Sequence, residues 1–233
     1  MKVSVIVFPG SNCDHDVIHL YGLLGQKVSS IWHRETDLKS PDILVIPGGF
    51  SHGDYLRTGA LAKLSPVMKE VKRFAESGGP VIGICNGFQI LCEAGLLPGV
   101  LLQNIRRRFL SQFVTYKVES TQTPFTRKLK VAEVLRSPIA HFEGNYFADP
   151  DTLSALEDNS QVIFRYCDLN GKVSHSDFNC NPNGAANSIA GICNKGRNVV
   201  GLMPHPERAA EKLVGWLGAD HGRQIFESSL QQL

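Results

Sequence analysis

The stretch PVIGICNGFQIL, residues 80–91, joins two patterns that belong to different kinds of secondary structure. Val81–Ile84 is a short apolar run between a proline and a cysteine, which predicts a buried strand. From Asn86 onward the apolar residues recur at helical spacing, which predicts a helix with one buried face. A strand that turns into a helix at Cys85, with a glycine two positions before and two after, has the pattern of a nucleophile elbow.

Cys85 by itself has two interpretations. The N-terminus of the helix that follows favours the thiolate, which is the reactive form of cysteine. The flanking glycines fit this view, because side chains there would clash within the tight turn and crowd an incoming substrate. A buried structural thiol is nevertheless the commonest role of a free cysteine. The elbow pattern favours the nucleophile, and the rest of the chain has to decide.

The composition is that of an ordinary globular protein, with 233 residues, 42% hydrophobic and 20% charged. This length suits a single α/β domain over residues 1–233. A net charge of +2 gives no argument for nucleic acid or membrane binding, and no apolar run approaches the ~20 residues of a membrane-spanning helix. The first residues read as a core strand and not as a signal peptide.

Six cysteines are spread too irregularly for a disulfide framework or paired zinc knuckles. We therefore expect free thiols, no metal site and a reducing, cytoplasmic location. In the Cys13–Asp16 stretch, neighbouring polar side chains diverge, so a loop and helix start is a better interpretation than a metal site.

Strand and helix patterns alternate along the first hundred residues. Strands are expected at Val3–Phe8, Val28–Trp32, Asp42–Ile46, Val81–Ile84, Phe113–Val118, Val162–Tyr166 and Val199–Met203. Helices are expected at Asp14–Leu24, at Ser65–Ala75, after Cys85 and at Ala219–Leu230. This alternation predicts an α/β fold with a mostly parallel central sheet and helices on both faces.

The middle of the chain differs from this alternation. Strand patterns between Leu101 and Tyr166 have no long helices between them, which predicts a smaller antiparallel extension of the sheet. Ligands of parallel sheets bind at the carboxyl ends of the strands. Cys13, Gly49 and Cys85 are all expected at that edge.

A thiol nucleophile needs a base, a group that orients the base, and donors for the oxyanion. His205 is the best candidate base, because it follows the expected strand Val199–Met203 and has a proline on each side that fixes its backbone. Glu207 is close enough to reach the far imidazole nitrogen and set its tautomer. An isolated His-Pro-Glu sequence would more simply be a polar turn.

Pro47–Gly49 is the candidate oxyanion loop. Glycine lets a backbone N–H approach a substrate carbonyl closely, and the amide of Asn86, directly after the nucleophile, can supply a second donor. A glycine-rich turn without function is about as good an interpretation of this loop alone.

Four ordered blocks carry a family resemblance that covers essentially the whole chain. They are Pro9–Asp14, Pro47–Arg57, Cys85–Leu91 and Met203–Arg208. The pattern Gly-x-Cys-x-Gly-x-Gln around Cys85, together with the distant Pro-His-Pro-Glu, resembles the class I glutamine amidotransferases. The four blocks together resemble, more narrowly, the glutaminase subunits of phosphoribosylformylglycinamidine synthase, the PurQ type. The resemblance implies the flavodoxin-like fold of that class.

The resemblance also implies a role for each matched position. Cys85 would be the nucleophile, His205 the general base and acid, and Glu207 its orienting partner. The oxyanion donors would be Gly49 and Asn86, and the residues that hold L-glutamine would include Gly48 and Gln89. Glutamine would be hydrolysed through a γ-glutamyl thioester to glutamate and ammonia.

In this family the ammonia passes to a large synthetase subunit, which uses ATP to convert formylglycinamide ribonucleotide to the amidine in purine biosynthesis. A small third subunit bridges the two in the three-chain form. The resemblance implies no cofactor in this chain, with ATP and Mg²⁺ at the synthetase. The chain itself carries neither a Walker A pattern nor a GxGxxG after a strand, so we expect no ATP-binding site in it.

One block departs from the family pattern. His141-Phe142-Glu143-Gly144 stands where such subunits usually read His-Gly-Glu-Gly, and phenylalanine cannot adopt a positive φ cheaply. His141 and Glu143 could form a second acid–base pair, or a pocket wall or subunit interface, which is the simpler interpretation. Arg57 could act at an interface or in a substrate loop. The Arg106–Arg108 run could dock a partner or contact phosphate, although such a run is more often a solvated surface.

Two alternatives remain beside an amidotransferase. Another cysteine hydrolase of the same architecture, protease-like or related to γ-glutamyl hydrolases, would keep the elbow but not the blocks at Pro9–Asp14 and Pro47–Arg57. A non-catalytic scaffold would not need Cys85, His205 and Glu207 together. Release of glutamate from glutamine discriminates among the three.

Overall fold

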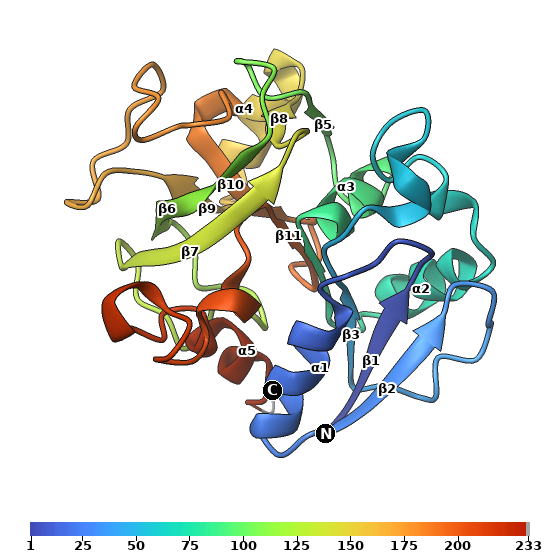
Figure 1. Cartoon of the computed structure of the whole chain (residues 1–233). Helices are drawn as coiled ribbons and strands as arrows, with labels where there is room; N and C mark the ends of the chain where they lie inside the picture. Colours follow the sequence, from blue (N-terminus) through green and yellow to red (C-terminus); the bar gives the residue numbers. More distant parts are fainter. Residues whose placement is uncertain (232–233) are drawn as a thin grey trace.

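One large sheet of nine strands runs through the molecule, whose computed structural model describes residues 1–231 (Figure 1). In spatial order its strands are β2 (Lys27–Trp32), β1 (Lys2–Val7), β3 (Ile43–Ile46), β4 (Val81–Ile84), β11 (Val199–Leu202), β10 (Ile189–Cys193), β9 (Val162–Tyr166), β6 (Leu110–Val118) and β7 (Val134–His141). Strands β2 to β11 in this order are parallel, and the remaining four pair antiparallel. A short antiparallel pair, β5 (Val100–Leu102) with β8 (Asn145–Phe147), lies beside the main sheet. The predicted parallel sheet with an antiparallel extension is thereby confirmed.

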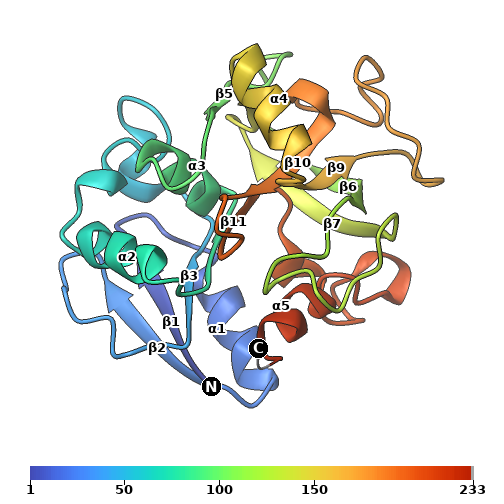
Figure 2. The same cartoon turned by 180° about the vertical axis from the view of Figure 1, so that it is seen from behind.

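Helices cover both faces of the parallel half, as Figures 1 and 2 show from opposite sides. The helices are α1 (Asp14–Leu23), α2 (Val67–Glu76), α3 (Asn86–Glu93), α4 (Pro150–Asp158) and α5 (Arg223–Ser229). On one face α1 and α5 pack together, with the rings of Tyr21 and Phe226 edge to face at 5.4 Å. On the other face lie α2 and α3. No helix within residues 1–231 combines the length and the apolar character needed to cross a bilayer.

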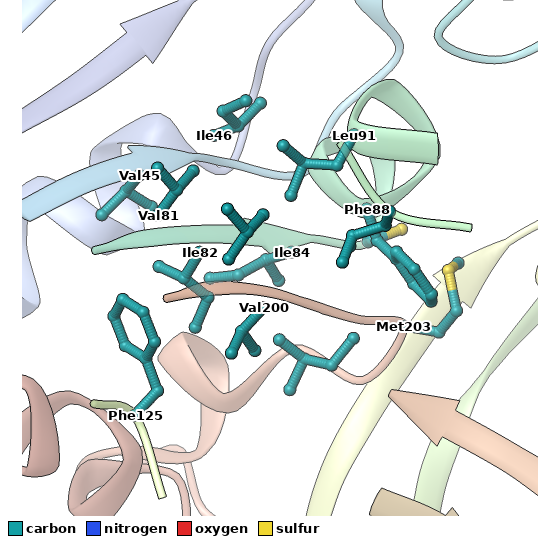
Figure 3. Close-up of a cluster of buried hydrophobic side chains, with 14 of the residues drawn as sticks. Val45, Ile46, Val81, Ile82, Ile84, Phe88, Leu91, Phe125, Val200 and Met203 are labelled. Carbon is teal, nitrogen blue, oxygen red and sulfur yellow. The ribbon is translucent and has the colours of Figure 1, made fainter. Parts of the chain in front are cut away.

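Helix α3 packs closely on the sheet because glycines face it. Gly83 of β4 is paired in register with Gly201 of β11. A Cβ at Gly201 would lie 2.2 Å from the ring of Phe88, and one at Gly83 would lie 2.5 Å from Leu91. Figure 3 shows these two side chains of α3 directed onto the strands. A third glycine, Gly87, brings α3 against the carbonyl oxygen of Ile46, which a Cβ would approach to 1.9 Å.

The glycines of the elbow therefore serve close helix–strand packing, as expected from the clash that side chains would cause within the tight turn. Because these glycines have no side chains, the start of α3 can lie directly behind the end of β4. The position of Cys85 is fixed by backbone packing on both sides of it.

Several elements differ from the sequence-based expectations, among them β5, β8 and β10, for which no strand was predicted. Helix α4 lies in the middle region where no long helix was expected. Its start carries a clear signal, because the side chain of Asp149 accepts a hydrogen bond from Thr152 N at 2.9 Å and Pro150 occupies the first turn. Strand β7 was not predicted, and its Pro138 is tolerated because β7 is the edge strand of the sheet. Helix α5 is shorter than the expected Ala219–Leu230.

Candidate active site

The carboxyl ends of four parallel strands bring the candidate site residues together. Strand β4 ends at Ile84, which pairs in parallel with Leu202, the last residue of β11. The amide of Cys85 then donates to the Leu202 carbonyl oxygen at 2.8 Å, so the two segments that follow β4 and β11 leave the sheet side by side. One leads into the elbow and the other into His205. Residues 85 and 205 are thus neighbours because their strands are adjacent, parallel and in register.

Cys85 is held in a strained backbone conformation with φ 50° and ψ −104°. A non-glycine residue adopts such values only where the surroundings enforce them, and nucleophile elbows are one such place. The residue is buried, and its thiol faces the carbonyl oxygen of Ala140 in β7 at 3.7 Å. It stands at the N-terminus of α3, where the helix dipole favours a negative charge on sulfur.

His205 and Glu207 form a buried pair, with Nδ1 of the imidazole 2.6 Å from Oε1 of the carboxylate. Because an ionised carboxylate only accepts hydrogen bonds, Nδ1 carries the proton and Nε2 is left for other chemistry. Nε2 is buried and has no partner of good hydrogen-bond geometry within residues 1–231. Burial opposes the imidazolium, but the charges of Glu207 and Cys85 outweigh it and raise the pKa of His205 well above its ordinary value.

Behind the imidazole lies a second thiol. Cys13, at the end of the loop after β1, is buried against the same ring, and Arg208 Nη2 donates to its Sγ at 3.0 Å. Gly48 completes the seat of the ring, since a Cβ there would lie 2.6 Å from His205 Cε1 and 3.0 Å from Cys13 Sγ. Gly48 therefore provides space for the imidazole, and its contact with L-glutamine, which the resemblance implies, stays a prediction.

The donor atoms of Cys13, His205 and Glu207 lie within 4.8 Å of one another, which raises the question of a metal site. Zinc bound tetrahedrally with bonds of ~2 Å would separate two of its ligand atoms by roughly 3.3 Å. The 2.6 Å between the imidazole and the carboxylate is too short for an intervening ion, and Arg208 already directs a positive charge at the thiol. The geometry is that of a hydrogen-bonded pair.

The two candidate oxyanion donors flank the nucleophile. Neither the amide of Gly49 nor that of Asn86 donates to an acceptor within residues 1–231. The Asn86 side chain accepts from Ser51 N at 3.1 Å and donates to Gln89 at 3.0 Å, which ties the loop after β3 to helix α3. Gly49 has φ 148°, and a Cβ there would meet the Ser11 backbone at 2.7 Å. Packing of neighbouring loops thus fixes both amides.

A pocket of about 210 Å³ opens over Cys85. Its lining residues are Gly49, Phe50, Asp54, Thr58, Cys85, Gln89, Ala140, His141, Phe142 and Glu143. They come from the loop after β3, the elbow helix and the end of β7. The pocket-wall interpretation of the turn that contains His141 and Glu143 therefore agrees with the structure, whereas Ala140 and Thr58 were not expected at the site.

Gln89 lines the pocket, but both ends of its amide are already engaged. It accepts from Asn86 and donates to the backbone carbonyl of Glu143 at 2.5 Å. Its observed contacts therefore position the pocket wall. Phe142 is more than a third exposed beside the pocket and does not have a positive φ, so the turn tolerates phenylalanine without strain.

His141 and Glu143 do not pair with each other. His141 Nδ1 contacts Asn104 Oδ1 at 3.1 Å, while the Glu143 carboxylate accepts from Thr58 N at 3.2 Å and from the Thr58 hydroxyl. Burial, with a smaller effect of His205, lowers the pKa of His141 to about 3. A second acid–base pair at these positions is therefore not formed.

The arginines considered in the sequence lie outside the pocket. Arg57 makes a bidentate ion pair with Glu93, at 2.5 and 2.7 Å. The guanidinium of Arg106 lies over the Phe178 ring, 4.1 Å from its centroid. Both contacts are within the chain, and all three residues of Arg106–Arg108 are exposed.

Comparison with known proteins relates the chain to glutamine amidotransferases. Residues 1–228 match the family described as the CobB/CobQ-like glutamine amidotransferase domain. The phosphoribosylformylglycinamidine synthase subunit PurQ of Gloeobacter violaceus is 55% identical over 229 residues, covering 98% of this chain and 96% of that protein. The chain belongs to the PurQ family of glutamine amidotransferases.

A further PurQ subunit, from Koribacter versatilis, is 53% identical over 229 residues, with 98% of this chain and 96% of that protein covered. Among solved structures, PurLQS from Thermotoga maritima contains a chain 40% identical to this one, with a TM-score of 0.84 over 98% of this chain and 97% of that one. Membership of the PurQ family confirms the resemblance found in the sequence, and the fold agrees across nearly the full length.

Proposed function

We propose that this chain is the glutaminase subunit of phosphoribosylformylglycinamidine synthase, with Cys85, His205 and Glu207 as its catalytic residues. The observation that carries the proposal is the strained Cys85 at the floor of a small pocket, beside a buried His205–Glu207 pair. A single amidotransferase domain, residues 1–233, forms part of this proposal. So do a cytoplasmic location and a complex with a large synthetase and a small bridging subunit.

The proposed reaction begins with attack of the Cys85 sulfur on the side-chain amide carbon of glutamine. The negative charge that develops on the amide oxygen is received by the N–H groups of Gly49 and Asn86. His205 takes the thiol proton and gives it to the departing nitrogen, which leaves as ammonia. Glu207 holds the imidazole in the tautomer that presents Nε2 and stabilises the charged ring.

The second half of the reaction reverses these roles. The γ-glutamyl group remains on sulfur as a thioester, and water activated by His205 attacks the thioester carbonyl. Glutamate leaves, and the thiol is restored. The ammonia would pass to the synthetase partner, where ATP and Mg²⁺ would be bound and the ribonucleotide substrate converted to its amidine. No step in this chain requires a cofactor of its own.

The test is glutamate release from L-glutamine by this chain assembled with its synthetase partners. Cys85→Ala should reduce the rate on the order of 10³-fold or more, and acid-quenched wild type should carry a γ-glutamyl adduct on the peptide that contains Cys85. The matched control is Cys92→Ala, which removes another thiol of α3 whose Sγ faces Pro98 O at 3.8 Å, away from the pocket. Activity that survives Cys85→Ala would rule out the proposed nucleophile, and cleavage of γ-glutamyl peptides in preference to glutamine would indicate a γ-glutamyl hydrolase.

A further inference from the structure

The pocket above Cys85 carries two carboxyl groups and no lysine or arginine among its described lining residues. Asp54 comes from the loop after β3 and Glu143 from the turn after β7, so segments far apart in the sequence bring two acids to one small volume. Neither acid is part of the Cys85–His205–Glu207 group. Two acids in a pocket without a lysine or arginine among its described lining residues call for a positively charged partner.

Glu143 is fixed as part of the pocket wall. Its carboxylate accepts hydrogen bonds from the amide and hydroxyl of Thr58, and its backbone carbonyl accepts from Gln89. Helix α3 and the loop after β3 thus hold this residue from both sides. Contacts within the chain therefore hold its carboxyl group near Asp54.

Asp54 differs because it lacks donors. Its Oδ1 is buried and has no hydrogen-bond partner within residues 1–231. The residue has φ 56°, in the left-handed region that aspartate and asparagine adopt more readily than most other non-glycine residues. Burial, and after it the charge of Glu143, raises the pKa of Asp54 to about 6. The nearest arginine of the loop, Arg57, is engaged by Glu93 and does not supply the missing donor.

A third polar group in the same pocket is also unpartnered. His141 is 3% exposed, and its Nε2 has no hydrogen-bond partner within the described residues. Because Nδ1 is beside the Asn104 carbonyl oxygen, the proton lies on Nδ1 and Nε2 is an acceptor. The unpartnered atoms of this pocket are therefore hydrogen-bond acceptors, which a ligand rich in donors would satisfy.

Glutamine supplies such donors at the end opposite its reacting amide. The α-ammonium is the one positive group of glutamine, and it lies at the far end of the substrate when the amide carbon is at Cys85. We propose that Asp54, with Glu143 beside it, binds the α-ammonium of glutamine and makes the pocket specific for γ-amides that carry it. This inference rests on the proposed glutaminase function and adds the determinant of substrate specificity.

The experiment compares two substrates in the assembled complex: L-glutamine, and the monoamide of glutaric acid, which has the same side-chain amide but no α-amino group. Asp54→Asn should lower kcat/KM for glutamine by about 10- to 100-fold, mostly through KM, because a charged hydrogen bond is replaced by a neutral one. For the glutaric monoamide kcat/KM should stay within about 2-fold of wild type. Glu143→Gln should show the same selectivity with a smaller effect, since this residue faces Asp54 and is already partnered.

Asp151→Asn is the matched control, because Asp151 is an exposed aspartate in the first turn of α4 and does not line the pocket. It should leave both substrates unaffected. The alkylation rate of Cys85 by iodoacetamide reports the elbow independently of substrate binding and should be unchanged in Asp54→Asn. Equal losses for both substrates, or no loss for glutamine, would overturn the assignment. If the wild-type complex hydrolyses no glutamine, the proposed function is wrong. If wild type hydrolyses glutamine and Asp54→Asn does so equally well, only the assignment of Asp54 is wrong.

Discussion

The packing of Gly48 against the proposed catalytic imidazole of His205 can be tested by adding one methyl group. In Gly48→Ala the new Cβ would lie 2.6 Å from His205 Cε1, 3.0 Å from Cys13 Sγ and 3.3 Å from His205 Nδ1. The backbone φ of Gly48 lies outside the left-handed region, so alanine fits the local conformation and the effect is steric. Ordinary contact requires about 3.4 Å, and the ring must therefore move by about 0.8 Å.

A displacement of this size at a catalytic group costs roughly 100-fold in rate. The 2.6 Å hydrogen bond between His205 and Glu207 would also be disturbed, because the methyl group meets the ring on its Nδ1–Cε1 edge. We expect kcat for glutamine hydrolysis to fall by roughly 10²-fold with a smaller change in KM. Steady-state glutamate release in the assembled complex measures both values, and thermal unfolding checks that the fold survives.

The matched control is Gly22→Ala in α1. A Cβ at Gly22 meets nothing within 4 Å, and the residue lies within a helix. This variant should keep wild-type activity and gain about 0.5–1 kcal/mol of stability, since alanine is favoured over glycine in helices. If Gly48→Ala retains kcat within about 3-fold of wild type, the contact with residue 48 does not confine the imidazole of His205.

Three further predictions concern the charge, the packing and the pH response of the site. Glu207→Gln removes the charge that stabilises the imidazolium, so kcat should fall on the order of 10²–10⁴-fold. The pH dependence of the rate of Cys85 alkylation has an inflection that reports His205, and this inflection should move to lower pH. An unmoved inflection would contradict the pairing. Gly87→Ala places a Cβ 1.9 Å from the Ile46 carbonyl oxygen, and we expect a loss of about 1–3 kcal/mol of stability and a Tm lower by several degrees, which calorimetry would measure; a wild-type Tm would show that α3 can move away from the sheet. Because only ionised Asp54 binds an ammonium well, KM for glutamine should fall as pH rises through about 6. Glu143 is the charged group that faces Asp54, and His141 stays neutral over this range. In Asp54→Asn the change of KM with pH should disappear, and its persistence would assign the titration to another group.

The local sequence around Cys85 determined the strand, the turn and the helix, because apolar periodicity and closely spaced glycines are properties of a few consecutive residues. The same holds for the proline-flanked His205 and for the parallel half of the sheet. Strand β7 was not predicted because a proline interrupts its pattern. An edge strand tolerates a proline because one side of the strand forms no hydrogen bonds with a neighbouring strand. That outcome depends on the position of β7 in the finished sheet.

The composition of the pocket was decided by the tertiary structure alone. No local signal indicates that Asp54 and Glu143 share one pocket, because the two residues follow strands that are distant in the sequence. Gly48 illustrates the same limit: the sequence marks a glycine after a strand, while only the fold shows that a histidine more than a hundred residues later occupies the space of its missing side chain. Short-range patterns fix local conformation, whereas burial, unpartnered acceptors and steric limits follow from which strand ends meet.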